Sequence, residues 1–141
     1  MLEVVICGAA RTPIGGFQGY FDGISASELG GAAIKAAILG AGVITVDEVL
    51  MGNVLSAGQG QAPARQAGFA AGLDDAVPAT TVNKMCGSGM KTTMIGYNHI
   101  ALGQSNLMAV GGMESMSNAP HILPKMRSGI RLGHTEIKDH M

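Results

Sequence analysis

The sequence predicts an α/β fold with a mainly parallel sheet, elements in the order β-α-β-α-β-α-β, and helices on both faces. Short apolar segments rich in Val, Ile and Met alternate with longer segments whose small apolar residues recur at helical spacing. Gly or Pro marks most of the turns between them. Of the 141 residues, 47% are hydrophobic and 22 are glycine, so the chain can bury one core and make many tight turns.

The first predicted strand covers residues 3–10, EVVICGAA. Its apolar run is continuous, which is typical of a strand buried on both faces of a parallel sheet. Cys7 lies inside this run and is expected to be a packing residue. An acidic residue precedes the run and Arg11 follows it, an order that does not fit a signal peptide. Pro13 and several glycines then predict a long loop.

The first predicted helix follows this loop. Ser25 and Glu28 have the spacing of a capping box that begins a helix. Gly40 and Gly42 mark its end, because glycine is favoured just beyond the last turn. The next segment, DEVLMGNVLSA at residues 47–57, has the length and composition of the second strand.

Two further helices and two further strands complete the alternation. Pro63 begins a short Ala-rich helix over residues 64–73. A third strand is predicted over 79–86, a helix over 89–102 and a fourth strand over 106–113. One face of the last helix carries Met90, Met94, Tyr97 and Ala101. Parallel strands joined in this way are expected to have right-handed crossovers.

The pattern stops after Ser115. Residues 116–141 show no clear period, contain two prolines and carry more charge than the rest. A stretch of this length without structure is unusual inside a compact domain. We therefore expect one α/β domain over residues 1–117 and an insertion loop or the start of another subdomain over 118–141, with the chain ending inside it.

The composition excludes several classes of function. Net charge is −1 without a basic cluster, which argues against a nucleic-acid or anionic-membrane surface. No apolar run approaches the roughly 18 residues of a membrane span. Charged residues are only 13%, so much of the surface is expected to be covered by other domains or subunits. Cys7 and Cys86 show no disulfide framework, and a reduced cytoplasmic setting is expected.

Cys86 is the candidate catalytic residue, in the stretch VNKMCGSGMK. It lies between a predicted strand and a predicted helix, where free N–H groups and the helix dipole favour a thiolate. Gly87 and Gly89 allow a sharp turn, similar to the nucleophile elbow of hydrolases, and N–H groups near such a turn can bind an oxyanion. A lone cysteine is more often a buried packing residue. The local sequence leaves both interpretations open.

No other residue completes a site by its spacing. His99 lies more than three turns along the helix, and the other histidines, His121, His134 and His140, lie in the tail, so we assign none as the base and none as a metal ligand. Phosphate binding is an alternative for the same turn, but Thr92 replaces the third glycine of G-x-G-x-x-G and the Walker pattern also fails. Structural roles are expected for three basic residues at loop or strand ends: Arg11, Arg65 and Lys84. Packing is expected for Met113 and Met116, which flank Glu114, with the lining of an adaptable apolar pocket as the alternative.

VNKMCGSGMK resembles the active-site cysteine segment of the thiolases. Three more stretches agree in order and spacing: AARTPIGGFQG, GQAPARQAGFAAGL and GGMESMSNAP. The tail, LPKMRSGIRLGH, resembles the start of the loop domain in the short-chain, biosynthetic type. The resemblance covers essentially this whole chain and about the first third of a full thiolase. Ala62 departs from the family motif, which often has Asn there.

The resemblance implies reversible condensation of two acetyl-CoA to acetoacetyl-CoA and CoA. Cys86 would carry the acetyl group as a thioester, and its N–H would contribute to an oxyanion hole. No bound cofactor or metal is implied, since the CoA thioesters are substrates. The activating His, a second Cys, an oxyanion-hole Asn and most CoA contacts would come from later parts of the chain.

The resemblance also implies a thiolase-like N-terminal half that lacks its final strand. Such a half packs against a second half and, in a homodimer or homotetramer, against another subunit. The 141 residues alone are expected to be inactive. Two alternatives stay open: a scaffold half that needs a separately encoded partner, and a nucleotide-binding α/β domain.

Overall fold

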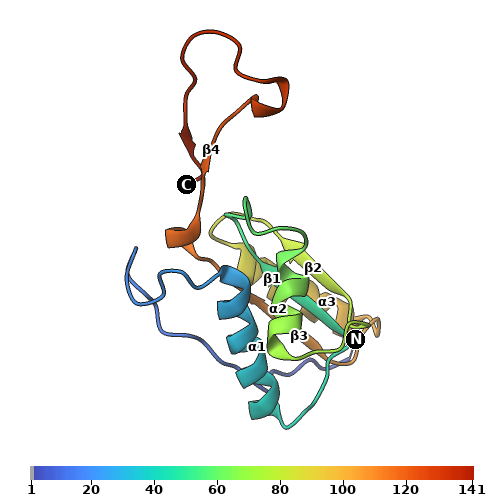
Figure 1. Cartoon of the computed structure of the whole chain (residues 1–141). Helices are drawn as coiled ribbons and strands as arrows, with labels where there is room; N and C mark the ends of the chain where they lie inside the picture. Colours follow the sequence, from blue (N-terminus) through green and yellow to red (C-terminus); the bar gives the residue numbers. More distant parts are fainter. Residues whose placement is uncertain (1) are drawn as a thin grey trace.

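The computed structural model describes residues 2–141 as an α/β body from which a narrow arm projects (Figure 1). The body contains three helices and three strands: α1 (Ala26–Ala41), β1 (Glu48–Gly52), α2 (Pro63–Ala71), β2 (Ala79–Val82), α3 (Ser88–Ala101) and β3 (Met108–Gly112). The arm region contains short elements: the 3-10 turns Met116–Asn118 and Met126–Ser128, and the strands β4 (His121–Ile122) and β5 (Lys138–Asp139). The alternation of strands and helices in the body confirms the predicted α/β class.

The sheet has the order β2-β1-β3, and both strand pairs are parallel. Leu50 of the central strand is in register with Thr80 of β2 and Val110 of β3. Helices α1 and α2 pack together in front of the sheet, and α3 lies behind it (Figure 1). This arrangement follows from right-handed crossovers, because β1–α2–β2 and β2–α3–β3 run in opposite directions across the sheet.

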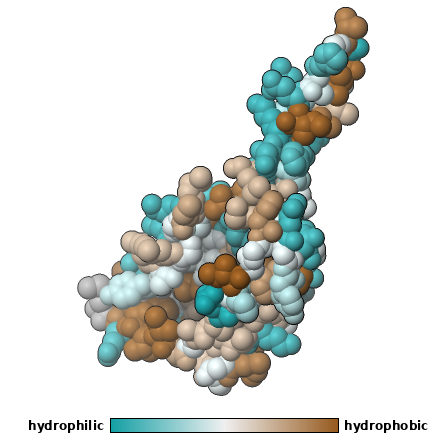
Figure 2. Space-filling view, turned by 90° about the vertical axis from the view of Figure 1, so that its left-hand side faces the viewer, coloured by the Kyte–Doolittle hydropathy of each residue, from teal (hydrophilic) through white to brown (hydrophobic). Residues whose placement is uncertain are grey.

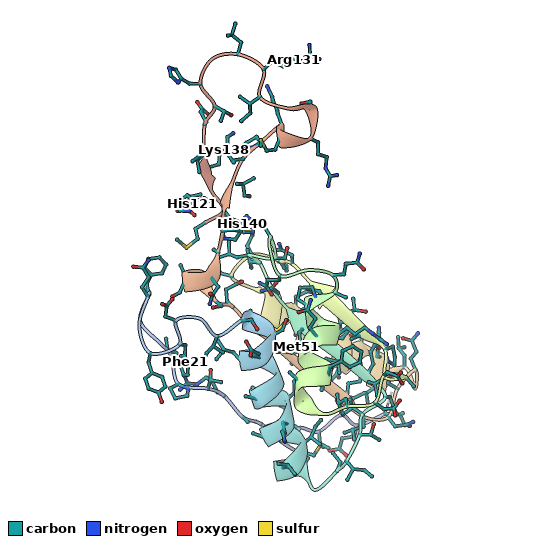
Figure 3. All side chains as sticks on the ribbon, viewed as in Figure 1. Phe21, Met51, His121, Arg131, Lys138 and His140 are labelled. Atoms are coloured by element: carbon teal, nitrogen blue, oxygen red, sulfur yellow. The ribbon has the colours of Figure 1, made fainter. Side chains whose placement is uncertain are left out.

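The core lies mainly between the sheet and the α1–α2 layer. Val49 and Met51 point into it from β1, 1% and 2% exposed. Met51 lies in the interior of the body, beside α1 (Figure 3), and a Cβ at Gly30 of that helix would be 3.2 Å from Met51 Cε. Ala64 and Ala67 of α2 are fully buried. With so few aromatic residues, the core depends on small residues that bring backbones close together.

The two ends of α1 confirm the predicted signals. Ser25 Oγ accepts a hydrogen bond from Glu28 N at 3.2 Å, and the Glu28 carboxylate accepts one from Ser25 N at 2.9 Å, which completes the capping box. The Ser25 hydroxyl, which donates to Glu28 Oε2 at 2.7 Å, and then the Ser25 N–H lower the pKa of the Glu28 carboxyl. Gly42 ends the helix in the left-handed region at φ 71°.

The predicted strand at residues 3–10 is wrong, because the structure has no strand there. Within the described residues, the backbone of residues 2–15 forms one hydrogen bond to other backbone groups, from Leu2 N to Ala101 O at 3.3 Å. Val5 and Ile6 are 71% and 83% exposed, and Cys7 is exposed instead of packed in a buried strand. The segment bonds to no strand of the sheet and lies against α1 instead, where a Cβ at Gly8 would meet Ala37 O and Ala41 Cβ.

The arm projects away from the body, with Arg131 at its far end (Figures 1 and 3). Strands β4 and β5 pair antiparallel over two residues each. Polar and apolar side chains are interspersed along the arm (Figure 2). At its base, His140 Nε2 accepts a hydrogen bond from Ala57 N at 3.2 Å, so the arm is attached to the loop after β1.

Helices long and apolar enough to span a bilayer do not occur in the described part of the chain.

Candidate active site

The candidate site lies at the carboxyl ends of the three parallel strands. An open cavity of about 410 Å³ is lined by residues that follow β1, β2 and β3, among them Asn53, Cys86 and Glu114. Four methionines form much of its apolar wall: Met85, Met113, Met116 and Met141. The carboxyl edge of a parallel sheet is the usual place for ligands in such folds.

Cys86 lies in the turn between β2 and α3 and is exposed. The strand ends at Val82, four residues earlier than predicted, and the helix begins at Ser88. Met85 takes a left-handed conformation at φ 48°, which is uncommon for a residue with a side chain. The exposed sulfur does not fit the packing interpretation of Cys86.

Ser88 holds this turn together from inside. Its Oγ accepts a hydrogen bond from Lys84 N at 2.9 Å and donates one to Met85 O. The residue is only 5% exposed. Because the hydroxyl bonds to the backbone of both Lys84 and Met85, it stabilises the two residues immediately before Cys86.

Glycines let the start of α3 lie directly against the strand ends. A Cβ at Gly52 would lie 2.6 Å from Ser88 Cβ and 2.8 Å from Gly89 N. A Cβ at Gly112 would lie 3.2 Å from Gly89 Cα. Thr92 Oγ1 also donates to Gly111 O at 2.8 Å, which joins the helix to β3. Side chains at these glycines would therefore push the Cys86 turn away from the sheet.

Several backbone N–H groups at Cys86 and in the first turn of α3 are free. Among residues 2–141, the backbone N–H groups of Cys86, Gly89 and Met90 donate no hydrogen bond. The first turn of α3 carries no acidic side chain. These donors and the helix dipole favour negative charge at this end of α3. The turn can thus stabilise a thiolate or an oxyanion.

Glu114 is a site residue that the sequence interpretation missed. Its Oε1 accepts hydrogen bonds from Asn53 Nδ2 at 2.8 Å and Leu55 N at 3.0 Å, and its Oε2 accepts one from Val54 N at 3.0 Å. The available signal was a single carboxylate directly after a predicted strand, between small and apolar residues. The flanking Met113 and Met116 both line the cavity, in agreement with the pocket alternative.

The histidines do not meet Cys86 in the described part of the chain. His99 Nδ1 lies 3.3 Å from Glu48 Oε2, on the first residue of β1, at the other end of the sheet. His140 bonds with Ala57, and His121 and His134 are exposed on the arm. Within the described range 2–141, no histidine lines the cavity. Residues 2–141 also hold no group of three His, Cys, Asp or Glu side chains that could bind a metal.

Two of the basic residues make structural interactions, as expected. Arg11 Nη1 donates to Thr12 O at 3.1 Å. Arg65 Nη2 donates to Asp75 O at 2.6 Å, and its guanidinium lies 5.0 Å from the centre of the Phe69 ring. Lys84 is exposed, and only its backbone bonds with the Cys86 turn.

Fold and site together define an α/β protein with an exposed cysteine on a strand–turn–helix elbow. Residues 4–141 match the thiolase N-terminal domain family. An acetyl-CoA acetyltransferase of Cupriavidus necator is 51% identical over the whole chain, which covers 36% of that relative. The Pseudomonas aeruginosa acetyl-CoA acetyltransferase is 48% identical with the same coverage, and acetyl-CoA acetyltransferase 2 of Arabidopsis thaliana is 51% identical over 99% of the chain and 35% of the relative.

This chain belongs to the thiolase family, through its N-terminal domain. It spans about a third of the length of the curated relatives that it matches.

Proposed function

We propose that the protein is an acyl-CoA acyltransferase that condenses two acetyl-CoA to acetoacetyl-CoA and CoA, reversibly, through an acetyl-Cys86 intermediate. The single observation that carries the proposal is the exposed cysteine between β2 and α3, beside unpaired N–H groups. The names of the relatives, all acetyl-CoA acetyltransferases, support the substrate class.

The first half-reaction is an acyl transfer to sulfur. The Cys86 thiolate attacks the thioester carbonyl of acetyl-CoA and forms a bond between Sγ and the acetyl carbon. The bond between that carbon and the CoA sulfur then breaks, and CoA leaves as a thiolate. Negative charge develops on the carbonyl oxygen, where the Cys86 N–H would donate a hydrogen bond. Low side-chain bulk at Gly87 and Gly89 leaves room for the approaching thioester.

The second half-reaction forms the carbon–carbon bond. A second acetyl-CoA loses a proton from its methyl carbon, and the carbanion attacks acetyl-Cys86. Acetoacetyl-CoA forms and the Cys86 thiolate is released. The activating His and the second, acid/base Cys are proposed to come from the family's later segments, because no histidine among residues 2–141 lines the cavity. The CoA thioesters are substrates, and we propose no bound cofactor or metal.

Residues 118–141 are proposed to begin the family's loop domain, after an α/β domain over 1–117. The many exposed apolar residues support a homodimer or homotetramer in which these faces are covered. We propose a cytoplasmic location; the relatives include both cytosolic and mitochondrial forms.

Acetylation of the complete natural polypeptide tests the proposal. After exposure to acetyl-CoA, peptide mass spectrometry should find one acetyl group on Cys86 and none on Cys7. Cys7→Ser is the matched control, because Cys7 is also exposed and free. Loss of acetylation in Cys7→Ser with retention in Cys86→Ser would contradict the proposed nucleophile.

The 141-residue chain alone is proposed to be inactive, either as a fragment or as a half that needs a separate partner. The absence of a histidine from the described cavity favours this. Robust thiolysis of acetoacetyl-CoA by these residues alone, abolished in Cys86→Ser, would contradict it. The nucleotide-binding alternative gains no support from the family match.

A further inference from the structure

Glu114 holds a three-residue segment, Asn53–Leu55, that follows β1. Its carboxylate accepts from the Asn53 side chain and from the N–H groups of Val54 and Leu55, at 2.8 to 3.0 Å. Among residues 2–141, the one side-chain contact of salt-bridge length joins His99 to Glu48, so no basic side chain pairs with Glu114. Its charge is therefore stabilised by N–H donors, which makes these bonds strong and directional.

Glu114 and the three residues that it binds all line the Cys86 cavity. The segment also reaches the Cys86 turn directly. Asn83 Nδ2 donates to Val54 O over a long 3.5 Å, and Asn83 Oδ1 accepts from Met85 N at 3.0 Å. A continuous set of contacts thus runs from Glu114 through Val54 and Asn83 to the residue before Cys86.

Asn53 supplies an independent observation. Its side chain is 2% exposed, and Nδ2 donates both to Glu114 and to Met113 O at 3.2 Å. Both partners are acceptors, so the orientation of the amide is determined. Its Oδ1 is buried and has no partner among the described residues. An unpaired buried acceptor is costly, and a functional role is one reason that a protein keeps such a group.

The segment that carries Glu114 is itself held on its other side. Ser115 Oγ and Asn118 Nδ2 both donate to Ile24 O, at 2.9 and 3.0 Å, and Ser117 Oγ accepts from Gln18 N at 2.7 Å. The 3-10 turn after Glu114 therefore joins the loop before α1 to the loop after β1. Glu114 acts from a backbone that is fixed at two places.

We propose that Glu114 is a positioning residue for the Cys86 site: it holds Asn53–Leu55 as one wall of the cavity, at the distance from Cys86 that the acyl thioester requires. The kinetic part of this inference rests on the proposed acyltransferase function. Both carboxylate oxygens of Glu114 already accept hydrogen bonds from Asn53–Leu55. Glu114 acts through the segment that it binds. Loss of its carboxylate should displace Asn53–Leu55 but keep the overall fold intact.

Hydrogen exchange tests the positioning without any activity. Glu114→Gln keeps the shape of the side chain but places an amide NH₂ where the carboxylate accepts N–H groups. Exchange at the Val54 and Leu55 amides of the complete polypeptide should become about tenfold faster or more, as bonds to the carboxylate are lost. Glu48→Gln is the matched control, because it removes a half-buried carboxylate from the opposite end of β1. Unchanged exchange in Glu114→Gln would overturn the inference.

Steady-state kinetics of acetoacetyl-CoA thiolysis tests the consequence. A displaced wall misplaces the bound thioester, so Glu114→Gln should raise KM and lower kcat, with a fall in kcat/KM of about 10- to 100-fold. Asn53→Ala should lower kcat/KM as well. The double variant should have a kcat/KM no lower than that of the more damaging single variant, because both changes displace the same segment, Asn53–Leu55. Glu48→Gln should match the wild type.

Four outcomes separate the possibilities. Additive losses in the double variant, or wild-type kinetics in folded Glu114→Gln, would overturn the positioning role. A fall in activity that disappears when assays are run well below each variant's melting temperature would show only a stability role and also overturn it. If the wild type forms no acetyl-Cys86, the proposed function fails, and hydrogen exchange alone then decides whether Glu114 holds the wall.

Discussion

The α1–α2 layer and the arm at residues 121–139 are held in opposite ways. In the layer, backbones lie so close that a Cβ at Gly31 would be 2.5 Å from Ala70 Cβ, and Ala64 and Ala67 are fully buried. In the arm every residue except Pro124 is exposed, and Leu132 is 98% exposed. The same aliphatic chemistry therefore stabilises one region and contributes little to the other, because only the layer has a surface to pack against.

The largest effect is expected where the layer is tightest. Gly31→Ala forces a methyl group against Ala70 and should lower the free energy of unfolding by about 1–3 kcal/mol, as overpacking does. Gly40→Ala, near the end of the same helix, has open space around its Cβ and should raise it by about 0.5–1 kcal/mol. Denaturant unfolding of both variants measures the difference. Equal effects at the two positions would show that α1 and α2 do not meet so closely.

The second effect concerns the start of α2. Ala64 N–H is buried with its residue at 0% exposure and donates to Thr81 Oγ1 of β2 at 3.0 Å. Thr81→Val removes this acceptor and should destabilise the protein by about 1–2 kcal/mol, the range for a lost helix cap. Thr80→Val on the same strand is the control, because Thr80 is exposed and should change little. Thermal unfolding of the two variants should differ by several degrees.

Local patterns predicted most of the body. Alternation of apolar runs and helical spacing identified the three strands and three helices, and Ser25, Glu28 and Gly42 marked the ends of α1 where the structure has them. The run at residues 3–10 failed for a physical reason. A β-strand forms only when its backbone pairs with a second segment, and the composition of residues 3–10 indicates only their own β propensity.

The candidate site was only half predictable. The exposed turn at Cys86 follows from its neighbours in sequence, since two glycines and a helix start lie beside it. Glu114 bonds to residues about 60 positions away, so no local pattern shows what it holds. Ser88 was also missed, because its two bonds depend on the unusual conformation of Met85. Long-range polar contacts are the part of a site that spacing cannot show.

A third prediction concerns strain before α2. Ala62 takes a left-handed conformation at φ 50° and has no side-chain cap bond. Ala62→Gly should raise stability by about 0.5–1 kcal/mol, because glycine adopts this region without the Cβ clash. Ala36→Gly, the same change on an exposed helical residue of α1, should lower it by about 1 kcal/mol. The melting temperature should rise in Ala62→Gly and fall in Ala36→Gly. A fall in both variants would show that Ala62 is not strained.

A smaller, pH-dependent effect is expected at Asp47, which directly precedes β1 and bonds with the residues before β3. Backbone hydrogen bonds from Asn106 and Leu107, at 2.7 and 3.1 Å, lower the pKa of the Asp47 carboxyl from its ordinary value of 3.8. A lowered folded pKa stabilises the protein above the ordinary value and loses that contribution as pH falls through the folded pKa. The melting temperature of the wild type should therefore exceed that of Asp47→Asn at pH 6, and the gap should close below pH 3.8. A gap that widens in acid would contradict this sign.

The smallest effect is expected in the arm. Leu132→Ser removes an aliphatic side chain with no buried surface, so the free energy of unfolding should stay within about 0.5 kcal/mol of the wild type. The measurement should be made at two protein concentrations that differ a hundredfold. If a second copy covers the arm, the wild-type melting temperature will rise with concentration and Leu132→Ser will reduce that rise. A loss above about 1 kcal/mol that is independent of concentration would show that Leu132 packs within its own chain, and the contrast between layer and arm would fail.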